Sequence, residues 1–148
     1  MKDYFGKDAA RLENKKLFLF DMDGTVYLDE TLFEGVPQLL DKIQNNGGKY
    51  VFITNNASKS VKDYVAKMHR LGLAQINEEH FFTSAQAMLM LLKEKHKHDL
   101  IYVQGTRSFV EEYKSSGLKI TTEYSNKAGA IVVGFDPEFT GEKVYTTC

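Results

Sequence analysis

The feature that most constrains this chain is an unbroken apolar run at residues 17–20 that ends in two carboxylates. Such a run has the composition of a strand covered on both faces, as in a parallel sheet that lies between helices. Asp21 and Asp23 lie two positions apart, so both side chains can point the same way if the strand continues. Gly24 then permits a sharp turn and lets backbone N–H groups approach a ligand closely. Open parallel sheets bind ligands beyond the carboxyl ends of their strands, so the sequence predicts a functional site here.

A repeated strand–helix pattern follows this run and predicts a parallel α/β sheet. Residues 26–35 mix apolar and acidic side chains, which favours a small hairpin or flap beside the site. Proline or capping residues mark the starts of three expected helices, at Pro37, Ser60 and Thr83. Two further strands are expected at residues 50–53 and 80–82.

A charged segment at residues 93–99 separates this pattern from a second one. The second pattern comprises strands at residues 101–103, 118–120 and 130–133, and helices around residues 109–113 and after Thr140. We therefore expect two parts, residues 1–97 and residues 98–148, with both parts of the α/β class.

A second polar cluster, Thr54-Asn55-Asn56, directly follows the strand at residues 50–53. Its hydroxyl, amides and backbone N–H groups would face the same crevice as Asp21, because parallel strands end at the same edge of a sheet. Alone, the cluster is more typical of a turn in which Thr or Asn caps a helix than of a phosphate site. Asp21 and Asp23 have a non-functional interpretation too, as part of a polar turn. Two carboxylates this close repel each other, however, and this repulsion is costly without a cation.

These two clusters carry a resemblance to a known family. The segment at residues 21–25, Asp-Met-Asp-Gly-Thr, resembles the first motif of the haloacid dehalogenase superfamily of phosphotransferases. With residues 54–56 and the following Ala-Ser-Lys-Ser, the chain is similar to its NagD-like, 4-nitrophenylphosphatase-like branch. The resemblance implies a three-layer core with a parallel sheet, present here in part, for residues 1–97. It also implies part of an α/β cap domain for residues 98–148.

The resemblance also implies a reaction. It would make this a magnesium-dependent phosphatase that acts on a small phosphate monoester through an aspartyl-phosphate. Asp21 would be the nucleophile and Asp23 the general acid and base. The Asp21 carboxylate and the Asp23 backbone carbonyl would bind the metal. Gly24, Thr54, Asn55 and Asn56 would bind the phosphoryl group.

Two further motifs of the family are not identifiable in this sequence. The third supplies a lysine that steadies the phosphoryl charge, and the fourth is an acidic cluster that completes the metal site. Asp136 follows Gly134 and Phe135, but Pro137 comes next, which does not give the acidic pattern. We therefore expect the sequence to map onto the first half of a family member. A chain of this extent would by itself be self-associated, unstable or completed by another polypeptide, with little phosphatase activity.

Composition narrows the partners and the location. The net charge of −1 indicates no general attraction to nucleic acid or to an anionic membrane. The only cysteine is Cys148, so neither an internal disulfide nor a cysteine-based zinc site is expected. The first residues lack the apolar core of a signal peptide, and no apolar run reaches the length of a membrane span. The default expectation is a cytoplasmic protein that acts on a small phosphorylated substrate, and self-association into a homo-oligomer stays open.

Other readings stay open at this point. A phosphotransferase or mutase of the same superfamily, or a non-catalytic binding module, would share the same motifs. His96 and His98 are metal-ligand candidates, but in a lysine-rich run they are more typical of solvated charges. Residues 105–107, Gly-Thr-Arg, follow a strand and are a weak indication of an anion site, with a plain turn as the alternative. The sequence does not predict which phosphate ester is the substrate.

Overall fold

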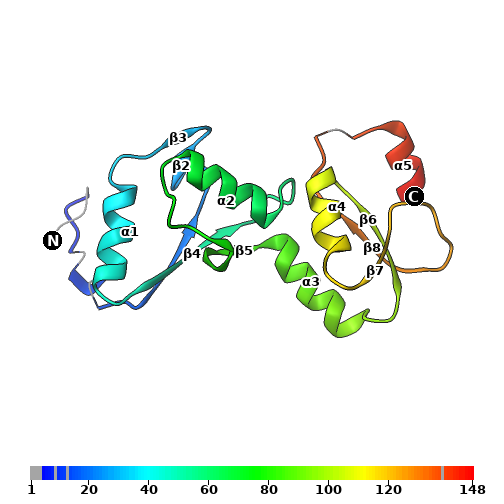
Figure 1. Cartoon of the computed structure of the whole chain (residues 1–148), viewed down its shortest axis with the longest axis horizontal. Coiled ribbons are helices and arrows are strands. Elements are labelled where there is room, and N and C mark those ends of the chain that lie inside the picture. The colour runs from blue at the N-terminus through cyan, green and yellow to red at the C-terminus, as the bar shows by residue number, and fades with distance from the viewer. Residues whose placement is uncertain (1–4, 9, 13, 138) are drawn as a thin grey trace.

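The structure, a computed structural model, describes residues 5–8, 10–12, 14–137 and 139–148. It consists of two lobes, each built on its own sheet, with one helix between them (Figure 1). The strands are β1 (Leu17–Asp21), β2 (Tyr27–Leu28), β3 (Thr31–Leu32), β4 (Lys49–Thr54), β5 (Phe81–Thr83), β6 (Leu100–Gln104), β7 (Lys119–Thr121) and β8 (Ala128–Val133). The helices are α1 (Val36–Asn45), α2 (Val61–Arg70), α3 (Ser84–Lys95), α4 (Arg107–Lys114) and α5 (Gly141–Thr147), with short 3-10 turns at Ala10–Leu12 and Glu78–His80.

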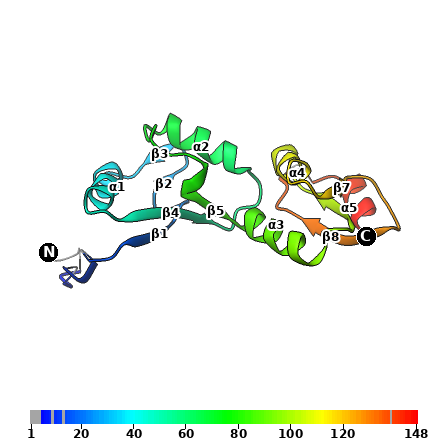
Figure 2. The same cartoon turned by 60° about the horizontal axis from the view of Figure 1, so that its bottom comes forward.

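The first sheet is parallel, as expected, with the strand order β1-β4-β5. In its register Leu19 lies opposite Val51, and Phe52 lies opposite Phe81. Helices α1 and α2 both lie on one side of this sheet (Figure 2). The segment between β1 and α1 forms the expected hairpin, in which β2 and β3 pair antiparallel.

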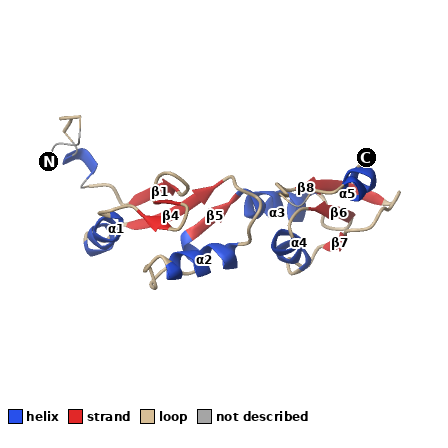
Figure 3. Cartoon of the chain, turned by 90° about the horizontal axis from the view of Figure 1, so that it is seen from above, coloured by secondary structure: helices blue, strands red, loops and turns tan. Residues whose placement is uncertain are grey.

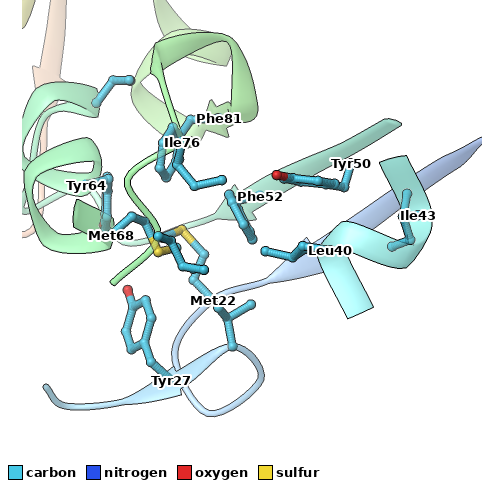
Figure 4. Close-up of a cluster of buried hydrophobic side chains, with 13 residues drawn as sticks. Met22, Tyr27, Leu40, Ile43, Tyr50, Phe52, Tyr64, Met68, Ile76 and Phe81 are labelled. Atoms are coloured by element: carbon cyan, nitrogen blue, oxygen red, sulfur yellow. The ribbon is translucent and has the colours of Figure 1, made fainter. Parts of the chain in front are cut away.

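The core of the first lobe lies between this sheet and its two helices. Phe52 is fully buried, and its ring centroid lies 5.6 Å from that of Tyr50 and 5.5 Å from that of Phe81. Tyr64 and Met68 of α2 pack against the same cluster (Figure 4). Burial of large apolar side chains of this kind stabilises a fold by about 1.5–3 kcal/mol each.

The expected helix starts are present. The Ser60 hydroxyl accepts a hydrogen bond from the Asp63 N–H, and the Asp63 carboxylate accepts one from the Ser60 N–H, which is a complete capping box. Thr83 and Gln86 form the same arrangement at the start of α3. Each box satisfies backbone N–H groups that have no partner inside the helix.

One expectation about β1 is wrong. The apolar run predicts burial on both faces, but Leu17 and Leu19 are 59% and 58% exposed. Together with Ile53 and Phe82, at 37% and 42%, they form the face of the sheet that points away from α1 and α2. None of the residues that the structure describes places a helix over this face. The apolar composition of a strand shows that both faces suit burial, but it does not show what covers them.

The second lobe is also a parallel sheet, with the order β7-β6-β8. Helices α4 and α5 lie on opposite sides of it (Figure 3). Its core contains Ile101, Val103 and Phe109, and also Ala85 and Leu92 from α3. Helix α3 therefore shares its buried face with the second lobe. The division into residues 1–97 and 98–148 stays a prediction.

Candidate functional site

The two polar clusters predicted from the sequence lie at the same edge of the first sheet. Asp21 is the last residue of β1 and lies opposite Ile53, so Thr54, the last residue of β4, comes one position further on. Because the two strands are parallel, the loops that follow them leave from the same edge. The structure thus brings residues 21–25 and 54–56 to one side of the sheet.

The loop after β1 is tightly turned around Met22. The Met22 carbonyl accepts hydrogen bonds from the Thr25 and Val26 N–H groups at 3.1 and 2.9 Å, and the Gly24 N–H donates to the Tyr27 carbonyl at 2.8 Å. Gly24 has a φ of 79°, in the left-handed region that glycine adopts without strain. Met22 is fully buried, whereas Asp21 and Asp23 are exposed. The loop therefore anchors itself through an apolar side chain and leaves both carboxylates open to a ligand.

Asp23 has a neighbour that the sequence did not reveal. The Tyr27 side chain is 1% exposed, and its hydroxyl lies within electrostatic reach of the Asp23 carboxylate. Burial and the Asp23 charge both raise the pKa of Tyr27, so this hydroxyl stays a hydrogen-bond donor. The Lys67 Nζ lies 3.7 Å from the centroid of the Tyr27 ring, on its face. Cation–π contacts with a buried lysine are worth up to about 2 kcal/mol.

Lys67 is unusual for a lysine, because it is only 5% exposed. Burial lowers its pKa, and the nearby Lys59 lowers it further, whereas the charges of Asp23, Glu30 and Asp29 raise it. A buried ammonium near a carboxylate pair supplies positive potential at this edge of the sheet. The signal in the sequence is its position: Lys67 follows Tyr64 by one helical turn and so lies on the apolar face of α2.

The loop after β4 is ordered by its own side chains. Thr54 is 4% exposed, and its hydroxyl accepts a hydrogen bond from the Asn56 N–H at 3.1 Å. The Asn56 side-chain oxygen accepts from the Ser58 N–H at 3.0 Å and from the Ser58 hydroxyl at 2.7 Å. The Tyr64 hydroxyl donates to the Asn56 carbonyl at 3.0 Å. Asn56 thus has a structural role in the turn, while Asn55 is exposed. The phosphate-binding roles of Gly24, Thr54, Asn55 and Asn56 stay predictions.

Asp21 and Asp23 are the carboxylates that the structure places at the end of β1. Within the described part of the chain, no group of three or more His, Cys, Asp or Glu side chains lies close enough together to hold a metal ion. Asp21 and Asp23 offer hard oxygen donors, which suit magnesium, an ion that usually keeps several waters and binds through one or two carboxylates. The donor set is thus suited to that ion, and the metal roles of Asp21 and Asp23 stay predictions.

Comparison with known proteins decides the family. The family model described as haloacid dehalogenase-like hydrolase matches residues 18–119, which include both polar clusters. The chain belongs to the haloacid dehalogenase-like hydrolases. Among the relatives of this haloacid dehalogenase-like chain is phosphoglycolate phosphatase 2 of Arabidopsis thaliana, 34% identical over 146 residues. That match covers 86% of this chain and 48% of the relative. Mouse chronophin is 26% identical, with 88% of this chain and 47% of chronophin covered.

Solved structures of haloacid dehalogenase-like relatives agree in fold. A 4-nitrophenylphosphatase from Thermotoga maritima superposes with a TM-score of 0.83 at 28% identity, over 93% of this chain and 51% of that one. A glycerol phosphate phosphatase from Mycobacterium tuberculosis, solved in complex with magnesium, gives 0.79 at 26% identity over 89% and 40%. The chain spans about half the length of the curated relatives it matches. The expected parallel α/β fold and the NagD-like resemblance are confirmed.

Two of the weaker candidates, His96 and Asp136, have local partners. The His96 Nδ1 lies 2.8 Å from an Asp99 carboxylate oxygen. Asp136, which does not fit the acidic motif, is buried and pairs with Lys143 at 2.6 Å. Among the described residues, no helix is both long and apolar enough to cross a bilayer.

Proposed function

We propose that the protein carrying this chain is a phosphatase that hydrolyses a small phosphate monoester through a phosphorylated Asp21. The observation that carries the proposal is the meeting of Asp21, Asp23 and Thr54 at one edge of a parallel sheet, in a haloacid dehalogenase-like chain. Relatives named for phosphoglycolate and glycerol phosphate support the substrate class, because both compounds are small phosphate monoesters.

In the first step, a carboxylate oxygen of Asp21 attacks the phosphorus atom. Its lone pair forms the new P–O bond, and the bond to the leaving oxygen breaks with its electron pair on that oxygen. Asp23, protonated at this stage, donates its proton to the departing alcohol. Asp21 is exposed at the end of β1, so a substrate can reach it from the edge of the sheet.

In the second step, water attacks the phosphorus atom of the aspartyl-phosphate. Asp23, now ionised, takes the proton of that water, and the P–O bond to Asp21 breaks, which releases inorganic phosphate and restores both carboxyl groups. The Tyr27 hydroxyl, which stays protonated beside Asp23, would donate to the Asp23 carboxylate and orient it for both proton transfers. Thr54 would donate to a phosphoryl oxygen.

Magnesium is the cofactor that the donor set suits. Asp21 through its carboxylate and Asp23 through its backbone carbonyl would hold the ion, and when bound it would offset the repulsion between carboxylates and phosphate. Lys67 acts in the same sense, because its charge lies within electrostatic reach of Asp23.

The test uses the longest natural protein that carries this sequence. Hydrolysis of phosphoglycolate, glycerol phosphate and 4-nitrophenyl phosphate is measured with and without magnesium, beside Asp21→Asn and Asp23→Asn. Asp21→Asn should abolish both turnover and the acid-labile phosphoenzyme, and Asp23→Asn should lower kcat by about 10²–10⁴-fold. Arg70→Gln, on the exposed end of α2, is the matched control. Full activity of Asp21→Asn would refute the assignment, and phosphate binding without turnover would favour a non-catalytic module.

A further inference from the structure

A second polar site lies in the other lobe, at the carboxyl end of β6. A cavity of about 310 Å³ opens there between the end of the strand and the first turns of α4. Ligand sites usually occupy about 300–1,000 Å³, so the volume suits a small metabolite. The cavity includes Gly105 and Arg107, from the Gly-Thr-Arg segment whose sequence weakly indicates an anion site.

The topology favours a ligand at this place. β6 is the central strand of its sheet, and the chain passes from β6 to β7 on one side and later to β8 on the other. The connection after β6 enters α4 on one face of the sheet, and the connection after its neighbour β8 enters α5 on the other (Figure 3). Adjacent parallel strands whose connections leave in opposite directions open a crevice at their carboxyl ends, where α/β sheets bind ligands. Gly105 occupies this end because a Cβ there would come within 2.5 Å of the Phe109 ring.

The charge of the lining is positive. Arg107, Lys114 and Lys143 face one carboxylate, that of Glu111. Lys114 pairs with Glu111 at 3.4 Å and Lys143 pairs with Asp136 at 2.6 Å. Over the part of the chain that the structure describes, Arg107 has no such ion pair, so its guanidinium is the uncompensated charge of the cavity.

The buried side-chain amide of Gln104 lines the same cavity, and one of its two polar atoms has no hydrogen-bond partner. Gln104 is 4% exposed, and its side-chain oxygen accepts a hydrogen bond from the Thr147 hydroxyl at 2.9 Å. Its amide nitrogen is buried, with no acceptor among the described residues. The Thr147 hydroxyl also lies 2.7 Å from the Lys143 carbonyl, and it has a single hydrogen to donate. A reversed amide would donate to Thr147 and leave its oxygen unsatisfied, so one end of the amide lacks a partner in either orientation.

We propose that this cavity binds a small organic anion through its phosphate or carboxylate oxygens, at a site separate from the Asp21 edge. Arg107 supplies the charge, and the Gln104 amide nitrogen donates to an anionic oxygen. The backbone N–H of Arg107 adds a third donor, since it lies in the first turn of α4 and has no acceptor within the helix. The proposal does not depend on phosphatase activity, because it concerns different residues in the other lobe.

The test is a titration of the chain with inorganic phosphate and, separately, with succinate. Both are followed by amide magnetic resonance shifts at constant ionic strength and without divalent metal. The shifts should concentrate at residues 104–107 and on the Gln104 side-chain amide. Whichever of the two anions binds more tightly shows whether phosphate or carboxylate is preferred. Arg107→Gln should weaken binding by at least about tenfold, since hydrogen bonds to charged groups are the strong ones.

The controls separate a built site from general charge attraction. Arg70→Gln removes an exposed arginine of the first lobe and should leave the affinity unchanged. Gln104→Leu should weaken binding as well, and Arg107→Gln carries the test if that buried variant fails to fold. Asp21→Asn should have no effect on this site. The proposal is overturned if the shifts concentrate at residues 21–25 and 54–56, or if Arg107→Gln and Arg70→Gln weaken binding equally. Absence of binding of either anion would also overturn it.

Discussion

Gly105→Ala tests how tightly the second lobe is packed at the end of β6. An added Cβ would lie 2.5 Å from Cδ1 of Phe109, a distance that real carbon atoms do not reach without movement. Phe109 is 2% exposed, and a Cβ on Gly134 would lie 2.8 Å from Cε1 of the same ring. The ring edge is therefore enclosed by two glycine backbones, so it has little room to yield. The backbone of Gly105 is outside the left-handed region, so alanine acts there through packing and not through φ strain.

The magnitude follows from two opposing effects. Adding a methyl group to a closed core costs about 1–3 kcal/mol. Replacing glycine by alanine also restricts the unfolded chain, which stabilises the fold by about 0.4–1 kcal/mol. The net expectation is a loss of about 1–2 kcal/mol, or roughly 3–8 °C in Tm for a chain of this size.

Thermal and urea unfolding followed by circular dichroism measure this loss. Gly141→Ala is the matched control, since a Cβ at Gly141 meets nothing within 4 Å; it should change the stability by less than about 0.5 kcal/mol. Phe109→Leu in the Gly105→Ala background should recover part of the loss, because the shorter side chain makes room for the methyl group. An unchanged Tm for Gly105→Ala, or strictly additive effects of the two substitutions, would refute the packing account.

Three further outcomes are expected. Ser60→Ala removes the acceptor of the Asp63 N–H and should cost about 0.5–2 kcal/mol in urea unfolding; no loss would mean that the cap is not formed. Burial raises the pKa of Glu112 above its ordinary 4.5, so the stability it contributes below that pH is lost as the pH rises through its folded value. The free energy of unfolding of Glu112→Gln, relative to that of the parent, should therefore be higher at about pH 7 than at about pH 4. The same difference from the parent at the two pH values would contradict this. Leu19→Thr should reduce light scattering at high protein concentration, because Leu19 lies on the exposed apolar face of the first sheet; unchanged scattering would show that this face takes no part in association.

Much of the fold could be predicted because its signals are local. Ser60 and Thr83 mark helix starts through hydrogen bonds to residues three positions away, and such short-range patterns are visible in the sequence. The exposure of Leu17 and Leu19 could not be predicted, since it depends on which elements cover the sheet. The packing of α3 against the second lobe was equally hidden, because it depends on contacts between Leu92 and strands far along the chain.

The candidate site divides in the same way. Asp21 and Thr54 could be placed at one edge because each directly follows an apolar strand. Lys67 and Tyr27 escaped prediction, because their meeting joins α2 to the hairpin after β1, and no spacing in the sequence reports it. A lysine on the apolar face of an amphipathic helix is the local sign that such a contact exists.

Both lobes are built on a three-stranded parallel sheet, but acidic side chains lie at the carboxyl end of β1 and an arginine lies beyond the carboxyl end of β6, and this difference predicts how each should respond to magnesium. At the first edge, Asp21 and Asp23 repel a phosphate dianion, so phosphate should bind there only when a cation offsets the two carboxylates. At the end of β6, Arg107 already supplies the positive charge, so phosphate binding there should not require a metal. Phosphate titrations with magnesium and with excess EDTA, followed at the amides of residues 54–56 and 104–107, measure both responses in one sample. Chelation should abolish the shifts at residues 54–56 and preserve those at residues 104–107. If both sets disappear with EDTA, or neither does, the charge at the strand ends does not govern anion binding in this protein.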